Sequence, residues 1–167
     1  MWATIGLILV VGAAGLYWFQ PWKLVTSKTV NEPLPVVPSA APPADGTAPA
    51  NRLLASGMIQ SHEHESSGSV RLVRLADGRV QLVLADLATS DGPDVHVWLT
   101  DQPVRADRDG WYVFDDGRHV ELGPLKANHG NQVYDVPAGT DLAGLTSVTL
   151  WCVRFSVSFA AAPLDAP

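Results

Sequence analysis

A run of β-favouring residues at positions 147–159, reading SVTLWCVRFSVSF, constrains the fold more than any other part of the chain. Side chains of an extended strand alternate between its two faces, and the first half of this run is largely apolar on both. In the second half, apolar side chains alternate with serines. We therefore predict a strand buried on both faces, followed after Arg154 by a strand buried on one face. Cys152, the single cysteine, lies between the two, so the core has no intramolecular disulfide.

Residues 51–167 consist of short alternating runs separated by Gly, Asp and Pro at intervals of about ten residues, a pattern typical of β-sandwiches and barrels. Asp77-Gly78, between two such runs, is a strong signal for a tight β-hairpin. No segment keeps a helical periodicity. We predict an all-β domain, an antiparallel β-sandwich of about eight to ten short strands. Besides the two strands of the C-terminal run, the expected strands are 54–61, 68–75, 79–87, 94–100, 111–114, 118–122 and 131–136.

Residues 2–19 contain no charged side chain and are almost wholly apolar. At about 1.5 Å per residue, a helix of this length spans roughly 27 Å, close to the hydrocarbon thickness of a bilayer. Three aromatic residues near its end, Tyr17, Trp18 and Trp22, suit a lipid–water interface. A cleaved signal peptide is the alternative, but the segment has neither a basic N-terminal region nor a small-residue cleavage site. We predict one transmembrane helix within an uncleaved anchor at residues 1–22.

Residues 23–50 separate this anchor from the domain, and from residue 31 onward they are rich in proline and alanine. Such a segment buries no core, and we predict an extended, polyproline-like linker. Twenty residues at about 3.1 Å each would hold the domain about 60 Å from the membrane. Lys23 and Lys28 follow the span and by the positive-inside rule favour a cytoplasmic domain. A stand-off linker is more typical of the outside, and we predict an extracytoplasmic, single-pass arrangement.

Four segments of the domain share their residue order with a known family. They read SHEHESSG at 61–68, GPDVHVWL at 92–99, LGPLKANHGNQVYDVP at 122–137 and SVTLWCVRFSVSFAAAPL at 147–164. Together they resemble the DM-thirteen electron-transfer domain family. The resemblance implies a β-sandwich that acts in extracytoplasmic electron transfer through its cysteine, either as a free thiol or by holding a haem. Cys152 and His64 are the residues that match the family pattern.

Cys152 is the first candidate site residue. A thiol titrates at about pH 8.5 unless a cation lowers its pKa, and the thiolate is the form that reacts or binds a metal. Arg154 follows two residues later, on the same face if the strand continues, and is a candidate thiolate stabiliser. The alternative is a buried cysteine that packs as a small apolar side chain. Core packing is also the expectation for Trp98 and Trp151.

His62 and His64 would share one face of a strand, next to Glu63 and Glu65. Two imidazoles and a thiolate can hold copper or a haem iron, which makes His62 and His64 candidate metal ligands and His64 a candidate cofactor ligand. The spacing is not the helical His-Glu-x-x-His of zinc proteases. Covalent haem attachment is excluded because Cys-x-x-Cys-His is absent, so any haem is non-covalent. The alternative is a polar strand end that runs into a turn.

The formal net charge of −6 argues against a nucleic-acid partner. The sequence contains no complete catalytic constellation, so enzymatic activity stays undecided. Two functions are open. The first is a membrane-tethered electron-transfer module centred on Cys152, with an unidentified redox or cell-envelope protein as its partner. The second is a non-catalytic β-sandwich that is displayed at the cell surface as a binding or structural module.

Overall fold

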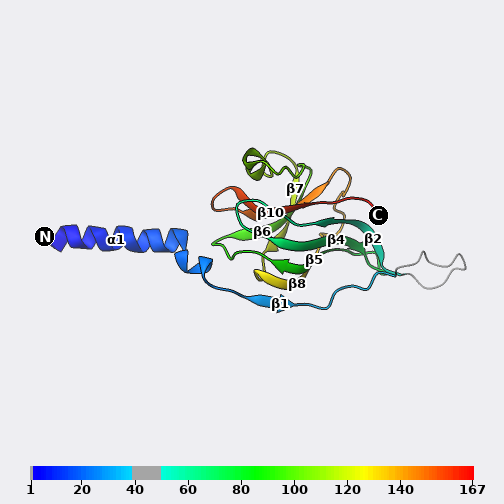
Figure 1. Ribbon diagram of the computed structural model, residues 1–167, viewed down its shortest axis with the longest axis horizontal. Coiled ribbons are helices and arrows are strands. Elements are labelled where there is room, and N and C mark those ends of the chain that lie inside the picture. The colour runs from blue at the N-terminus through cyan, green and yellow to red at the C-terminus, as the bar shows by residue number, and fades with distance from the viewer. Residues whose placement is uncertain (1, 39–49) are drawn as a thin grey trace, which may run out of the picture.

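The computed structural model describes residues 2–38 and 50–167. Within them, ten strands form two sheets, and helix α1 (Trp2–Phe19) projects from one end of the resulting sandwich (Figure 1). This arrangement confirms the predicted all-β sandwich and its N-terminal apolar helix. Residues 2–23 are long and apolar enough to cross a membrane.

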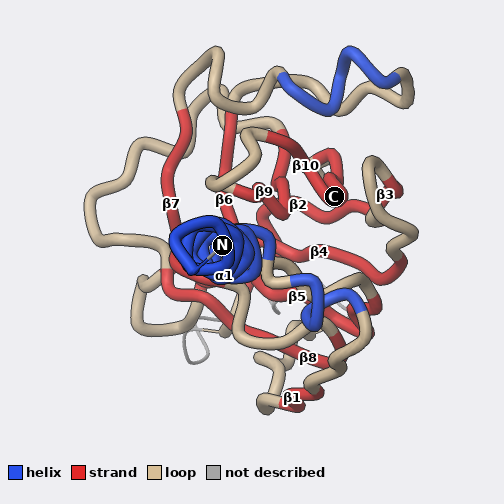
Figure 2. Tube along the Cα trace, turned by 90° about the vertical axis from the view of Figure 1, so that its left-hand side faces the viewer, coloured by secondary structure: helices blue, strands red, loops and turns tan. Residues whose placement is uncertain are grey.

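The two sheets have five strands each. In order across the sheet, sheet A contains β1 (Thr29–Asn31), β8 (His129–Asp135), β5 (Val80–Ala88), β4 (Ser67–Arg74) and β2 (Arg52–Met58). Sheet B contains β3 (Gln60–Ser61), β10 (Val157–Pro163), β9 (Ser147–Cys152), β6 (Val95–Thr100) and β7 (His119–Pro124). Neighbouring strands are antiparallel except β1 and β8, which run parallel. Viewed along α1, the sheets form two layers (Figure 2).

The interior between the sheets is filled by aliphatic side chains from both, with Leu82 and Leu84 of β5 and Val97 and Leu99 of β6 fully buried. A second apolar cluster covers the outer face of sheet B and contains Trp98, Phe114 and Trp151. β9 is thus buried on both faces, as predicted from its sequence.

β10 differs from the prediction. The chain turns over residues 153–156, so the strand begins only at Val157, and Phe155 stays partly exposed. Ser158, expected to face solvent, is fully buried because its hydroxyl lies 2.8 Å from Nδ1 of His62 and accepts a hydrogen bond from Thr149. A serine can occupy a buried strand position when its hydroxyl is paired in this way.

Two other predicted strands are also corrected. The segment 111–114 is not a strand: its first two residues end the 3-10 helix η2 (Arg108–Tyr112), and the other two lie in the turn that follows. η2 begins after Asp107, whose carboxylate accepts a hydrogen bond from the backbone of Gly110. The predicted strand 54–61 is divided between two sheets, with β2 in sheet A and β3 in sheet B.

The predicted linker does not stand free over residues 28–37. After α1 and the short 3-10 helix η1 (Pro21–Leu24), the chain forms β1 along the edge of sheet A. Leu34 and Val37 then pack against the outer face of that sheet, beside Val73 and Val83. The composition predicts a free linker, and it does not reveal that residues 29–31, just before Pro33, pair with the edge of a sheet. The rest of the predicted linker, residues 39–49, lies outside the described residues.

Candidate functional site

Cys152 is the last residue of β9 and faces the interior of the sandwich, between Val95 of β6 and Val157 of β10 in the strand register. It is 0% exposed and belongs to the main apolar cluster. Burial raises the pKa of its thiol, and the nearby carboxylates of Asp94 and Glu63 act in the same direction. Backbone N–H groups directed at the sulfur oppose this effect without reversing it. The thiol is therefore protonated at neutral pH.

The turn at residues 153–156, which we call the β9–β10 turn, follows this cysteine. Ser156 has φ 48°, in the left-handed region that non-glycine residues seldom adopt. Because β9 ends at Cys152, the alternation that would place Arg154 on the same face is interrupted. The guanidinium Nη1 of Arg154 instead donates to the carbonyls of Tyr17 (3.3 Å) and Trp18 (2.7 Å) at the end of α1. These contacts give no support to a thiolate-stabilising role for its side chain, whereas its backbone N–H does point at the sulfur.

The structure does not bring the imidazoles of His62 and His64 together. His62 is buried beneath η2, where its ring stacks on Phe114 with 5.8 Å between the ring centroids. His64 packs instead on Phe159, at 3.9 Å between ring centroids. Burial lowers the pKa of both histidines. Within residues 2–38 and 50–167, no group of three or more His, Cys, Asp and Glu side chains is placed to hold a metal ion.

His64 is connected to the surroundings of Cys152 through the ring of Phe159, which belongs to the same apolar cluster as the cysteine. No direct contact links the two residues that match the family pattern. The candidate site is therefore the buried thiol of Cys152, in the same apolar cluster as the ring on which His64 packs.

A haem does not fit this arrangement. An axial sulfur ligand needs open space beside it for the iron and the porphyrin, whereas the sulfur of Cys152 is enclosed by core side chains. His64 is held against Phe159 and is not opposed to the sulfur across a cavity.

An aromatic cluster on the outer face of sheet B was only partly visible in the sequence. The rings of Trp98 and Trp151 lie 5.4 Å apart, and His119 stacks on Trp98 at 4.0 Å. Phe114 meets Trp151 edge-on at 6.3 Å. The buried positions of Trp98 and Trp151 confirm the expected core packing. The cluster also includes residues from loops or strand ends, namely His62, Phe114 and His119. Sequence periodicity in such segments does not indicate which side chains will pack together.

The raised pKa of Cys152 gives a prediction about stability and pH. The unfolded thiol ionises at about pH 8.5, whereas the folded thiol keeps its proton to higher pH. Its stabilising contribution is therefore complete below about pH 8.5 and is lost as the pH rises through the raised pKa of the folded thiol. Denaturant unfolding of the full chain in detergent should show that the gap in unfolding free energy between wild type and Cys152→Ala shrinks between pH 7 and about pH 9.5. A gap in unfolding free energy that is the same at both pH values would mean that folding does not raise the pKa of the Cys152 thiol.

Comparison with known proteins supports the resemblance seen in the sequence. The family model described as electron transfer DM13 matches residues 58–164, well over half of the chain. The matched segment contains Cys152, His64 and strands β3 to β10. No curated protein and no solved structure matched.

Proposed function

The chain belongs to the electron-transfer DM13 family, and from this premise we propose a membrane-tethered electron-transfer module with Cys152 as its redox centre. The match over residues 58–164 carries the proposal, because it includes the cysteine and almost the whole sandwich. The redox partner is a protein of the membrane or cell envelope.

The proposed tether is α1, which is long and apolar enough to cross a membrane. Its apolar side chains are exposed along its length, among them Leu9 at 68% and Val10 at 67%. An exposed apolar surface of this size is unfavourable in water and suits a lipid environment. We place the domain on the extracytoplasmic side. Lys23, which counted toward the opposite orientation, donates to the carbonyl of Gly92 and lies 3.5 Å from the Asp91 carboxylate, so its charge is partly neutralised.

The chemistry at Cys152 is limited by its burial. The sulfur reaches neither water nor a second thiol, so sulfenic acid and disulfide formation are closed to it. The balanced oxidation that remains is loss of one electron to a one-electron acceptor on the partner, together with loss of the thiol proton to a base. The carboxylates of Asp94 and Glu63, whose charges raise the pKa of the thiol, are the candidates for that base.

The second candidate is a non-catalytic binding or structural sandwich. One observation favours it, the complete burial of an uncharged thiol in the core. In that case Cys152 contributes packing alone.

Protein-film voltammetry of the full chain in lipid nanodiscs distinguishes the two. We expect a redox wave in wild type that is absent from Cys152→Ala. The matched control is Val157→Ala, which removes a buried apolar side chain paired with Cys152 across β9 and β10 and should keep the wave. A wave that survives in Cys152→Ala would remove the cysteine from the electron path. No wave in any variant would favour the display module.

A further inference from the structure

We propose that the end of the sandwich that carries Cys152 lies directly on the membrane, with the β9–β10 turn in contact with the lipid interface. The inference rests on the tether proposed above and takes the bilayer itself as the occupant of this surface. It replaces the stand-off arrangement that the proline-rich linker suggested.

The chain between α1 and the domain is short. α1 ends at Phe19, and Lys28 is already bound to the domain: its backbone N–H donates to Oδ1 of Asn128 at 2.7 Å, and its carbonyl accepts from the backbone of His129 at 3.1 Å. Nine residues of fully extended chain reach about 32 Å at most, and η1 shortens this path further. The domain therefore stays far closer to the membrane than the roughly 60 Å that a free linker would allow.

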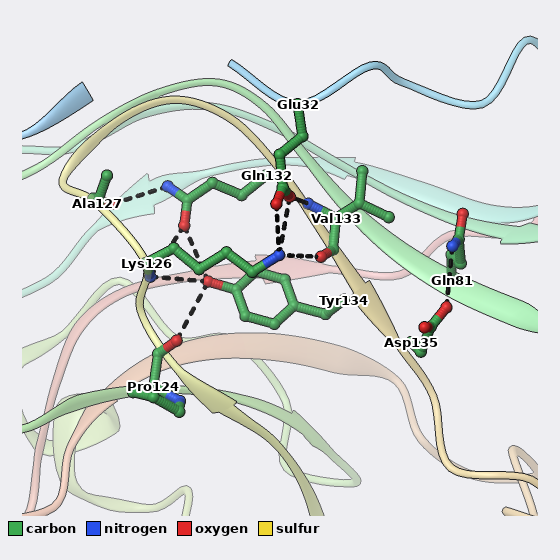
Figure 3. A network of polar contacts seen from close by, with 9 residues as sticks. All are labelled: Glu32, Gln81, Pro124, Lys126, Ala127, Gln132, Val133, Tyr134 and Asp135. Atoms are coloured by element: carbon green, nitrogen blue, oxygen red, sulfur yellow. Dashed lines mark hydrogen bonds and ion pairs between the residues drawn. The ribbon is translucent and has the colours of Figure 1, made fainter. Parts of the chain in front are cut away.

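The segment that follows Lys28 is held to sheet A by strong polar contacts as well as by strand pairing. Figure 3 shows the carboxylate of Glu32 joined to Lys126 and Val133 at one edge of a polar network. Nζ of Lys126 donates to both of its oxygens at 2.8 Å, and the backbone of Val133 donates at 2.7 Å. The hydrogen bond from Lys126 holds the pKa of Glu32 below its usual range. The same ammonium lies over the ring of Tyr134, at 4.8 Å from its centroid.

α1 and the β9–β10 turn are in direct contact. Arg154 binds the carbonyls of Tyr17 and Trp18, which have lost their intrahelical partners at the negative end of the helix dipole. Phe155 stacks on Phe19, with 5.8 Å between the centroids and 17° between the planes. A residue that touches the last turn of a membrane-spanning helix lies at the same depth as that turn.

The side chains at this depth are those that a lipid interface favours. Phe155 is 39% exposed and Val153 41%, although both follow a fully buried strand, and Trp18, Phe19 and Trp22 are exposed beside them. Tryptophan, tyrosine and arginine are enriched at membrane interfaces because they combine an apolar body with a polar or charged group, and Tyr17, Trp18 and Arg154 are of this kind. The exposed apolar surface of the turn is continuous with that of α1, so both surfaces are expected to contact the bilayer.

Depth measurement by spin labels on the full chain in liposomes tests the inference. Three variants, each in a Cys152→Ala background, carry one label: Val10→Cys within α1, Val153→Cys in the β9–β10 turn and Asp77→Cys in the β4–β5 hairpin at the opposite end of sheet A. The readout is relaxation by lipid-soluble oxygen relative to relaxation by a water-soluble nickel chelate. We expect the Val10 label to be deep, the Val153 label to be interfacial and the Asp77 label to be aqueous.

The label depths distinguish failure of the proposed membrane contact from failure of the proposed tether. A deep Val10 label with a Val153 label as water-accessible as the Asp77 label would overturn the membrane contact and leave the tether intact. An aqueous Val10 label would remove the tether, and the membrane contact with it. Neither result bears on the redox wave of Cys152, which the voltammetry tests separately.

Discussion

Gly130→Ala is expected to detach β1 from sheet A and to release the domain from the membrane surface. Gly130 has φ +98°, and a β-carbon there would overlap the carbonyl oxygen of Val30 in β1 and lie 2.8 Å from Oδ1 of Asn31. β1 and β8 cannot keep their parallel register with this atom between them. We expect faster amide exchange across β1 and a Val153 label that becomes as water-accessible as the Asp77 label.

The matched control for this variant is Gly78→Ala. Gly78 has a similar φ of +91° in the β4–β5 hairpin, but no atom lies within 4 Å of the β-carbon that alanine would add. Both variants incur a backbone strain of about 1–2 kcal/mol, and Gly130→Ala alone displaces a neighbouring strand. Equal exchange rates in β1 for the two variants would show that β1 is not held by close packing at Gly130.

Trp151→Ala is expected to have the largest effect on stability, a loss of about 3–5 kcal/mol in unfolding free energy. Trp151 is fully buried between Trp98 and Phe114, and its removal leaves a cavity that these large rings cannot fill by small shifts. Denaturant unfolding of the full chain in detergent measures the change. Trp22→Ala, which removes an exposed ring beside α1, serves as the control and should change the stability of the sandwich little. A loss below about 1 kcal/mol for Trp151→Ala would mean that the aromatic cluster is loosely packed.

The sequence predicted β9 well, because apolar side chains on both faces of a short run leave few alternatives to a doubly buried strand. It predicted β10 less well. Serines at alternate positions usually face solvent, and Ser158 is buried only because His62 and Thr149 supply hydrogen-bond partners from distant parts of the chain. Such a partnership depends on tertiary contacts that local periodicity does not encode.

The position of β1 was beyond sequence reasoning for a similar reason. Three residues of strand just before a proline-rich segment carry almost no local signal, and the contact between Glu32 and Lys126 joins residues 94 positions apart. Gly130 was the available clue, since a glycine in a strand often marks close approach of another backbone.

The candidate site was predicted in part. Cys152 and His64 were named from the motif, and the structure buries Cys152 in the main apolar cluster and packs His64 on Phe159, a member of that cluster. The expected pairing of His62 with His64 assumed a continuous strand, whereas β3 ends at Ser61 and the two side chains diverge into different clusters. The expected position of Arg154 likewise depended on a strand that ends at Cys152.

If the β9–β10 turn rests on lipid, Cys152 is separated from the bilayer by the turn that immediately follows it. The redox centre would then lie at the membrane end of the domain, where a membrane-bound partner approaches over a shorter path than a soluble one.

The pH dependence of the midpoint potential of the wild-type wave tests the central claim most directly. Because burial keeps the thiol of Cys152 protonated across neutral pH, its one-electron oxidation must release one proton. We predict that the midpoint potential falls by about 59 mV per pH unit between pH 5 and pH 8, the slope of a couple that exchanges one proton per electron. A potential that does not change over this range would contradict Cys152 as the redox centre.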